Sequence, residues 1–309
     1  MIEPVRAEAR ALFASSLDAS DRVLVTGAGG WFGLTLAALL HRSEVPAMFT
    51  TQRPRQISFG TGTATAQGWN WNDVQHFAPT VVIDCAFILR DHIDSMTLAT
   101  YVHENARLTS RLLQLAALDG VRCIVSVSSG AAIHPVDAAT SELDTNPYGH
   151  LKRQAELAVR RLAEETGTTG FVARPFSVTG SLVTRPERYA FSNFVLQART
   201  GTISIAAKHP VWRRFVGVDD FFAVALATAA RGSGVLDSGG DLIEFRDLAL
   251  RVQSALGKPA DVTHADADGS LADDYASDDV SWRVTCTALG FTPATLDEQI
   301  VAVEAALPA

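Results

Sequence analysis

The first half of the chain alternates short apolar runs with longer amphipathic stretches. A short run that is apolar throughout predicts a strand buried on both faces, whereas apolar residues recurring every three or four positions predict a helix. Strands that alternate with helices indicate βαβ crossovers and a parallel sheet. The predicted strands are 22–26, 45–50, 80–83, 121–127 and 171–175, and the predicted helices are 2–17, 31–41, 98–118 and 147–165.

This alternation ends after residue 175. Residues 176–212 and 233–309 are richer in turns and short elements, which indicates a smaller second lobe. The fold class that we predict is therefore α/β, a Rossmann-type doubly wound parallel sheet with a C-terminal substrate-binding lobe. The predicted boundaries are 1–175 for the Rossmann-type domain, near 213–232 for a segment that returns to it, and 176–309 for most of the second lobe.

Composition narrows the class of protein. Hydrophobic residues make up 47% and charged residues 19% of 309, which favours a sizeable core over disorder. The net charge of −8 argues against a nucleic-acid groove or an anionic membrane surface, which require basic stripes. The most apolar stretch, 221–230, is too short to span a membrane, and the first residues lack the apolar core of a signal peptide. We expect a soluble, cytoplasmic protein.

Three widely spaced cysteines, Cys85, Cys123 and Cys286, exclude a disulfide framework and provide no CxxC metal pair. We predict no metal site.

A glycine-rich string, TGAGGWFG over residues 26–33, joins the first predicted strand to the helix that follows it. Gly27, Gly30 and Gly33 allow a tight turn, close approach of the backbone to a pyrophosphate, and close packing of helix on strand. The phosphates then lie at a helix N-terminus, where free N–H groups and the helix dipole favour negative charge. The string predicts a dinucleotide site.

The second predicted strand bears on which dinucleotide binds. An NAD site usually has a carboxylate at the end of this strand for the ribose 2′-hydroxyl. This chain has no acid there but has Arg53 and Arg55, which can pair with a 2′-phosphate. We predict NADP(H), with NAD as the alternative.

Tyr148 and Lys152 stand four residues apart at the start of a predicted helix, so their side chains share one face. An ammonium beside a phenol lowers the phenol's pKa, and tyrosine can then exchange a proton with a carbonyl or alcohol. The chain contains only three lysines and four tyrosines, so the pairing is unlikely to be a coincidence. We predict that Tyr148 and Lys152 are catalytic.

These motifs together resemble the extended short-chain dehydrogenases/reductases of the nucleotide-sugar epimerase/dehydratase family, from Val23 to about Val303. The matching strings are VLVTGAGGWFG (23–33), VVIDCAF (81–87), Asn105, VSVSSGAA (125–132), NPYGHLKRQAE (146–156), ARPFSVTG (173–180) and WRRFVGVDD (212–220). The resemblance implies a homodimer formed through the helices 98–118 and 147–165. It also implies cofactor contacts from Gly27, Gly30, Trp31, Phe32, Gly33, Asn70, Trp71, Ala86, Phe87, Tyr148, Lys152 and Pro175, to which the charge argument above adds Arg53.

Departures from the family pattern affect the expected chemistry. Gly130 stands where the family usually has a catalytic serine or threonine, and Ser129 is the expected substitute. Ala131 and Ala132 replace the acidic pair of the family's dehydratases, so dehydration is not expected. His134 replaces the aromatic residue of a Val-Tyr-Gly ending and is a further candidate for a substrate contact.

The resemblance also implies that the second lobe binds a nucleotide diphosphate sugar. Ser129, Ser177, Asn193 and Arg213 are the expected contacts, and the choice between Arg213 and its neighbour Arg214 stays open. We predict an NADP(H)-dependent 4-ketoreductase acting on a nucleotide-linked (deoxy)sugar. The alternatives are an NAD-dependent nucleotide-sugar epimerase with a tightly held cofactor and a catalytically weak NAD(P)-binding sensor or scaffold.

Overall fold

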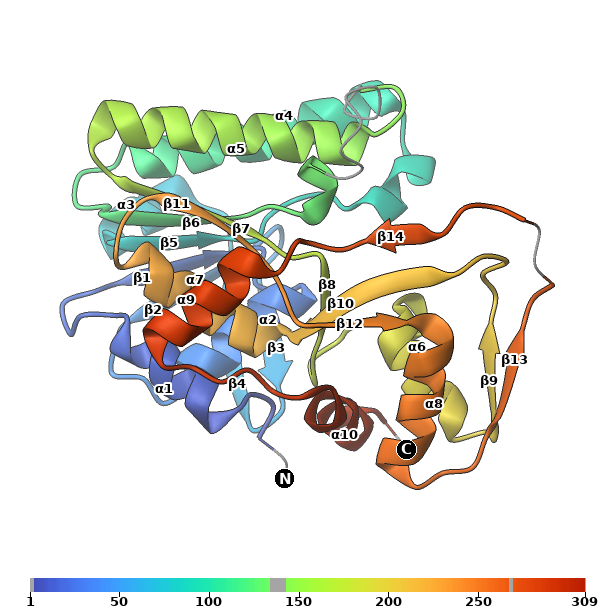
Figure 1. Ribbon diagram of the computed structural model, residues 1–309. Coiled ribbons are helices and arrows are strands. Elements are labelled where there is room, and N and C mark those ends of the chain that lie inside the picture. The colour runs from blue at the N-terminus through green and yellow to red at the C-terminus, as the bar shows by residue number, and fades with distance from the viewer. Residues whose placement is uncertain (1–2, 134–142, 267–268, 309) are drawn as a thin grey trace.

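The computed structural model describes residues 3–133, 143–266 and 269–308 (Figure 1). Within these ranges the largest element is an eight-stranded sheet of order β11-β7-β6-β5-β1-β2-β4-β3, in which all neighbours are parallel except the hairpin β3–β4. Its strands are β1 (Val23–Thr26), β2 (Ala47–Thr51), β3 (Arg55–Phe59), β4 (Gly62–Gly68), β5 (Val81–Asp84), β6 (Cys123–Val127), β7 (Thr169–Arg174) and β11 (Gly234–Asp237).

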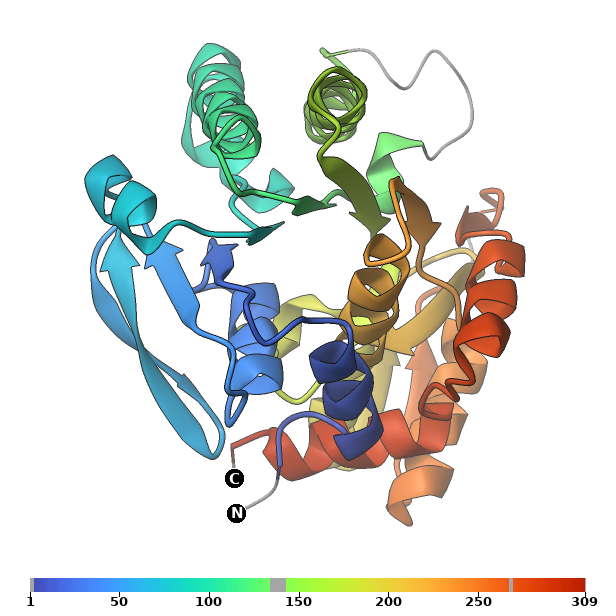
Figure 2. The ribbon, with the colours of Figure 1, turned by 90° about the vertical axis from the view of Figure 1, so that its left-hand side faces the viewer.

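Helices cover both faces of this sheet, as a doubly wound fold requires (Figures 1 and 2). α4 and α5 lie side by side on one face, where α3 joins them. On the other face α7 packs against α1, α2 and α9. These helices are α1 (Ala7–Ser15), α2 (Trp31–Leu40), α3 (Trp71–Phe77), α4 (Leu98–Ala116), α5 (Pro147–Thr166), α7 (Val218–Ala229) and α9 (Val280–Leu289).

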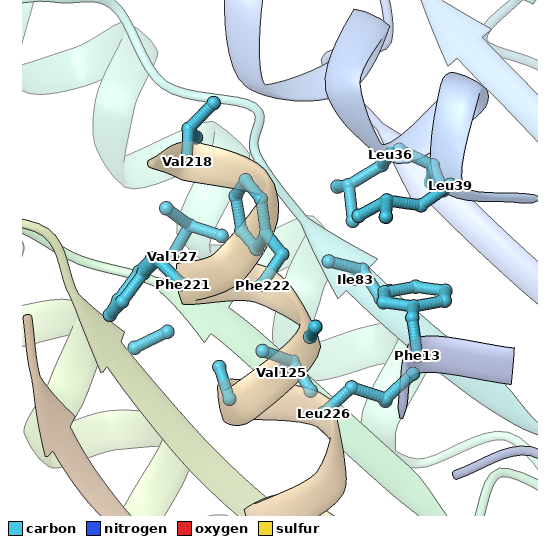
Figure 3. Close-up of a cluster of buried hydrophobic side chains, with 14 of the residues drawn as sticks. Phe13, Leu36, Leu39, Ile83, Val125, Val127, Val218, Phe221, Phe222 and Leu226 are labelled. Atoms are coloured by element: carbon cyan, nitrogen blue, oxygen red, sulfur yellow. The ribbon is translucent and has the colours of Figure 1, made fainter. Parts of the chain in front are cut away.

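The central strands have no polar face because successive side chains enter two different cores. Val125 contributes to the core beneath α7, which Phe221 and Phe222 fill (Figure 3). Its neighbour Ile124 points the other way, into the core shared with α4 and α5. Burial on both faces explains why these strands appear in the sequence as continuous apolar runs.

The second lobe has its own sheet and core. β10 pairs with β12, β14 and β8, and β9 pairs with β13. α6, α8 and α10 pack together beside this sheet around a separate apolar cluster (Figure 1). The elements are β8 (Ser177–Thr179), β9 (Thr202–Ile205), β10 (Val211–Gly217), β12 (Asp241–Glu244), β13 (Asp261–His264), β14 (Asp273–Tyr275), α6 (Ala190–Ala198), α8 (Phe245–Leu256) and α10 (Leu296–Ala306).

The predicted fold class is confirmed, with two differences in detail. The hairpin β3–β4 was not predicted, so the expected third strand is β5 in the structure. The chain returns to the large sheet beyond the expected 213–232, because β11 pairs with β7 and α9 packs against α7. In the part of the chain that the structure describes, no helix is long and apolar enough to cross a membrane.

Candidate active site

The glycine-rich turn lies between β1 and α2, as predicted. Gly27 has a φ of +63°, and a Cβ there would lie 2.7 Å from the Cys85 carbonyl carbon. A Cβ on Gly33 would lie 2.4 Å from the Ala28 Cα, so only glycine lets α2 approach the turn this closely. Among the described residues no side chain caps the α2 N-terminus, which leaves its first N–H groups available for phosphate.

A cavity of about 400 Å³ opens beside this turn at the carboxyl ends of the strands. It lies where β1 is flanked by β2 on one side and β5 on the other, the point at which the strand order reverses. Doubly wound folds bind dinucleotides at this position. The lining residues are Thr26, Gly27, Thr50, Thr51, Gln52, Trp69, Ala86, Phe87, Ile88, Glu104, Arg107, Leu108 and Arg111.

Arg55 is the arginine that lies on the phosphate turn. A Cβ built on Gly29 would be 1.4 Å from the Arg55 Nη2, so the guanidinium lies directly over this glycine. Arg55 begins β3, shortly after the end of β2, and pairs with Ala66 at the open end of the hairpin. Arg53 lies in the exposed connection before β3. The structure therefore places the Arg55 guanidinium on the turn.

Asn70 and Trp71, two of the predicted cofactor contacts, do not line the cavity. Asn70 caps α3, its side chain accepting a hydrogen bond from the Asn72 N–H at 2.9 Å. Trp69, which lies between β4 and α3, lines the cavity instead, and the Arg111 guanidinium lies 4.1 Å from its ring centroid. Sequence reasoning missed Trp69 and Arg111 because the two residues are 42 positions apart in the chain, and only the fold brings them together.

Ala86 and Phe87 line the cavity, as expected, on a segment that polar side chains hold in place. Asn105, fully buried on α4, accepts a hydrogen bond from the Ile88 N–H at 2.8 Å. The Tyr101 hydroxyl donates to the Ile88 carbonyl oxygen at 2.9 Å. These bonds fix the path of the backbone directly after β5.

Tyr148 and Lys152 share one face of α5, and Phe87 lies against both. The Lys152 Nζ donates to the Val127 carbonyl oxygen at 2.7 Å and lies 3.8 Å from the Phe87 ring centroid. The Phe87 and Tyr148 rings meet edge to face, with centroids 5.7 Å apart. α5 starts as predicted, with Asn146 as its cap, which accepts from the Gly149 N–H at 3.0 Å.

The expectation that Lys152 lowers the pKa of Tyr148 is wrong for this structure. Burial raises the pKa of Tyr148, and a hydrogen bond with Ser129 offsets only part of that rise. Burial also lowers the pKa of Lys152 to about 8, because desolvation penalises its charged form. Tyr148 is therefore a neutral phenol near pH 7, suited to donating a proton.

Ser129 lies beside Tyr148, whereas Gly130 leaves no room for the missing hydroxyl. The Ser129 Oγ accepts from the Ala131 N–H at 3.2 Å and lies 3.4 Å from the Tyr275 hydroxyl. A Cβ on Gly130 would lie 2.5 Å from the Phe176 Cδ1. A serine or threonine at position 130 would require this ring to move.

A buried ionic network lies behind α5 and the end of β6. Glu156 accepts from Arg174 Nη2 at 2.6 Å and Nε at 2.7 Å, and the Ser128 hydroxyl also donates to it. Arg174 extends the network to Asp237 on β11 at 3.3 Å. Because each charged group has a partner, the network links β6, α5, β7 and β11 without leaving an unpaired buried charge.

The structure distinguishes the two arginines of β10. Arg213 lies over the Tyr275 ring and forms an ion pair with Asp273, with 2.6 Å between Nη2 and Oδ2. Arg214 donates to the Ser277 and Gly240 carbonyl oxygens, both at 3.0 Å. Arg213 is the one beside the catalytic centre, and Arg214 holds the backbone together.

The remaining predicted residues lie around the junction of the two lobes. Trp31 begins α2, and its ring packs against Tyr189 of the second lobe with centroids 5.1 Å apart. The Phe32 ring packs against Phe222. The Pro175 carbonyl oxygen accepts a hydrogen bond from the Gly130 N–H at 2.9 Å. Ser177 begins β8, and Asn193 lies half-buried on α6. His134 lies outside the described residues.

The turn and cavity fit a nicotinamide dinucleotide. The close contacts at Gly27 and Gly33, the uncapped α2 N-terminus and the arginines around the cavity form a cradle for an anionic, elongated ligand. The fold and site therefore define a dinucleotide-binding protein of the doubly wound class.

The sequence profile of the NAD dependent epimerase/dehydratase family matches residues 23–237, more than half of the chain, and the chain belongs to this family. The predicted family is thereby confirmed, and with it an enzyme of an NAD-dependent family. No curated protein sequence matches the chain.

Solved structures of low sequence identity share the fold. UDP-glucose 4-epimerase from Brucella ovis, in complex with NAD, is 18% identical with a TM-score of 0.71, covering 93% of this chain and 98% of its own. GDP-mannoheptose C4 reductase from Campylobacter jejuni, with NADP bound, is 16% identical with a TM-score of 0.69 and the same two coverages. UDP-glucose 4-epimerase from Thermotoga maritima, with UDP-glucose, is 19% identical with a TM-score of 0.69, covering 92% and 98%.

Proposed function

We propose that this protein is an NADP(H)-dependent reductase of a keto group on a nucleotide-linked sugar. The observation that carries the proposal is the cluster of Tyr148, Lys152 and Ser129 next to a cavity whose phosphate turn is covered by the Arg55 guanidinium. The cluster suits carbonyl–alcohol chemistry, and the arginine suits a 2′-phosphate. Structural neighbours that act on UDP- and GDP-linked sugars support the substrate class.

The roles of the side chains follow from their chemistry. Bound NADPH supplies a hydride. Tyr148 donates its phenol proton to the oxygen of the reduced carbonyl, which requires the neutral form that burial favours. Ser129 donates a hydrogen bond that orients this oxygen, and Lys152 holds a ribose hydroxyl once the Phe87 ring has moved aside.

The chain's own residues favour reduction over the family's other reactions. Ala131 and Ala132 lie in the short helix η2 (Gly130–Ala132), and neither can exchange the protons that dehydration needs. The end of β2 has no carboxylate to bind the ribose 2′-hydroxyl of NAD. An epimerase retains and recycles NAD, so the missing carboxylate favours a reductase that uses NADPH. A homodimer formed through α4 and α5 belongs to the same proposal.

The first experiment is to identify any nicotinamide nucleotide released from the purified protein, and to titrate the emptied protein with NADPH and NADH. We expect ready exchange and tighter binding of NADPH, followed by NADPH oxidation with UDP- or GDP-linked 4-keto sugars. Retained NAD that does not exchange would instead support the epimerase.

Arg55→Ala is the matched test of the cofactor preference. Loss of a charge-assisted pair with phosphate should weaken NADPH binding by roughly 10- to 100-fold and leave NADH binding nearly unchanged. Arg53→Ala removes the same charge from an exposed position off the turn and should change neither dissociation constant. Equal effects of the two variants would contradict the assignment of Arg55.

A further inference from the structure

A second tyrosine reaches the catalytic centre from the other lobe. Tyr275 ends β14, which pairs in parallel with β10 so that Tyr275 lies opposite Arg213. Its hydroxyl lies 3.4 Å from the Ser129 Oγ, although 146 residues separate the two in the chain. Ser129 therefore has a hydroxyl partner on each side, Tyr148 from α5 and Tyr275 from the second lobe.

The same aromatic ring that excludes a side chain at Gly130 supports Tyr275. A Cβ on Gly130 would lie 2.5 Å from Phe176, and the Phe176 and Tyr275 rings pack with centroids 5.1 Å apart. The position that resembles the family's hydroxyl residue is thus filled by Phe176, and a hydroxyl from elsewhere lies next to Ser129 instead.

Contacts on the other side of the ring fix its position. The Arg213 guanidinium lies 5.6 Å from the Tyr275 ring centroid and donates to the Asp273 carbonyl oxygen at 3.0 Å. The Arg213–Asp273 ion pair therefore ties β14 to β10 two residues before Tyr275. Burial raises the pKa of Tyr275, so its hydroxyl keeps a proton to donate near pH 7.

We propose that Tyr275 and Ser129 together hold the substrate's carbonyl oxygen, in place of the hydroxyl that Gly130 lacks, while Tyr148 remains the proton donor. This inference rests on the proposed function. A carbonyl oxygen accepts two hydrogen bonds, and both strengthen as hydride addition makes it an alkoxide, so the effect falls on kcat. The second lobe then supplies part of the catalytic centre as well as the binding surface.

The kinetic test is Tyr275→Phe, which keeps the ring against Phe176 and removes only the hydroxyl. We expect kcat to fall roughly 10- to 100-fold with little change in KM or in NADPH affinity. Tyr189→Phe is the comparison variant, since the Tyr189 ring packs on Trp31 of α2, and it should retain activity. Activity of Tyr275→Phe within about twofold of wild type, or a change in KM alone, would overturn the inference.

A substrate-free measurement separates this inference from the proposed function. The chain has four tyrosines, so ¹³Cζ-tyrosine NMR gives four resonances that single Tyr→Phe variants assign. We expect the Tyr148 resonance to shift in Ser129→Ala, which removes its hydrogen-bond partner, and in Tyr275→Phe. An unmoved Tyr148 resonance in Tyr275→Phe overturns the inference, whichever sugar the enzyme reduces. Failure of every keto sugar with wild type would overturn the proposed function alone.

Discussion

At Gly130 a side chain is absent because the Phe176 ring occupies the space that a Cβ would need. The sequence shows only that a hydroxyl is missing from a serine-rich run. The structure shows why it cannot be restored by substitution, and which other side chain lies next to Ser129. Phe176 therefore excludes a hydroxyl side chain at position 130 and also packs against Tyr275, whose hydroxyl lies next to Ser129.

Gly130→Ser should lower the free energy of unfolding by about 1–3 kcal/mol, because the added atoms overpack the contact with Phe176. It should also reduce activity rather than raise it, since the displaced ring supports Tyr275. Denaturant unfolding and steady-state kinetics measure the two effects. Gly234→Ala is the control, because its Cβ would meet the Phe171 ring at an ordinary 3.5 Å. A stable, more active Gly130→Ser variant would contradict this account.

At the scale of elements, the start of α5 shows how close packing sets catalytic geometry. A Cβ on Gly149 would lie 2.1 Å from the Ala131 carbonyl oxygen, so only glycine allows the first turn of α5 to lie against η2. Asn146 ties the same two elements, its Nδ2 donating to the Ala131 carbonyl oxygen at 3.3 Å. This contact brings Tyr148 next to Ser129.

The contact of the N-terminal segment with α7 predicts a pH dependence of stability. Arg6 donates to both Asp220 oxygens at 2.8 Å, and its backbone N–H donates to Asp219 at the same distance. Burial and the neighbouring Asp219 carboxylate raise the pKa of Asp220 to about 7. The folded state then keeps a proton that the unfolded chain releases near pH 4, so this contribution to stability is lost as pH rises through about 7.

The measurement is the free energy of unfolding of wild type and Asp220→Asn from about pH 5 to about pH 8. Wild type should lose stability relative to the variant by at least about 1 kcal/mol, the equivalent of one pKa unit. Parallel curves for the two proteins would show that Asp220 does not titrate in this range.

At the scale of the whole molecule, ion pairs join the lobes outside the catalytic centre. Asp91, in the short helix η1 (Arg90–Ser95) after β5, pairs with Arg185 at 2.7 Å and Arg188 at 2.6 Å. Arg185 precedes the short helix η4 (Pro186–Arg188) and Arg188 ends it, and Tyr189, which follows, packs on Trp31. The partly exposed pairs therefore hold the second lobe against the first.

Asp91→Asn should change the free energy of unfolding by less than about 1 kcal/mol, because exposed ion pairs contribute little to stability. The KM for the proposed nucleotide-sugar substrate should nevertheless rise several-fold, since the two lobes must be held together to bind it. Denaturant unfolding and kinetics on one protein preparation measure both effects. A large loss of stability with an unchanged KM would assign Asp91 a purely structural role.

The sequence by itself determined the large sheet, the phosphate turn and the Tyr148–Lys152 face, because each depends on residues close together in the chain. Local spacing carries these features: apolar runs for buried strands, glycines for the turn, and a four-residue interval for one helix face. It could not reveal the hairpin β3–β4, whose strands are partly exposed and lack an apolar run.

Only the tertiary structure decided which of Arg53 and Arg55 lies on the turn, which aromatic side chain enters the cavity, and which group lies beside Ser129. It also reversed the expected direction of the pKa shift of Tyr148, because burial outweighs the hydrogen bond with Ser129. Each of these outcomes depends on side chains that are distant in sequence and on how much water their packing excludes. The spacing of residues along the chain shows neither which distant side chains meet nor how much water is excluded from them.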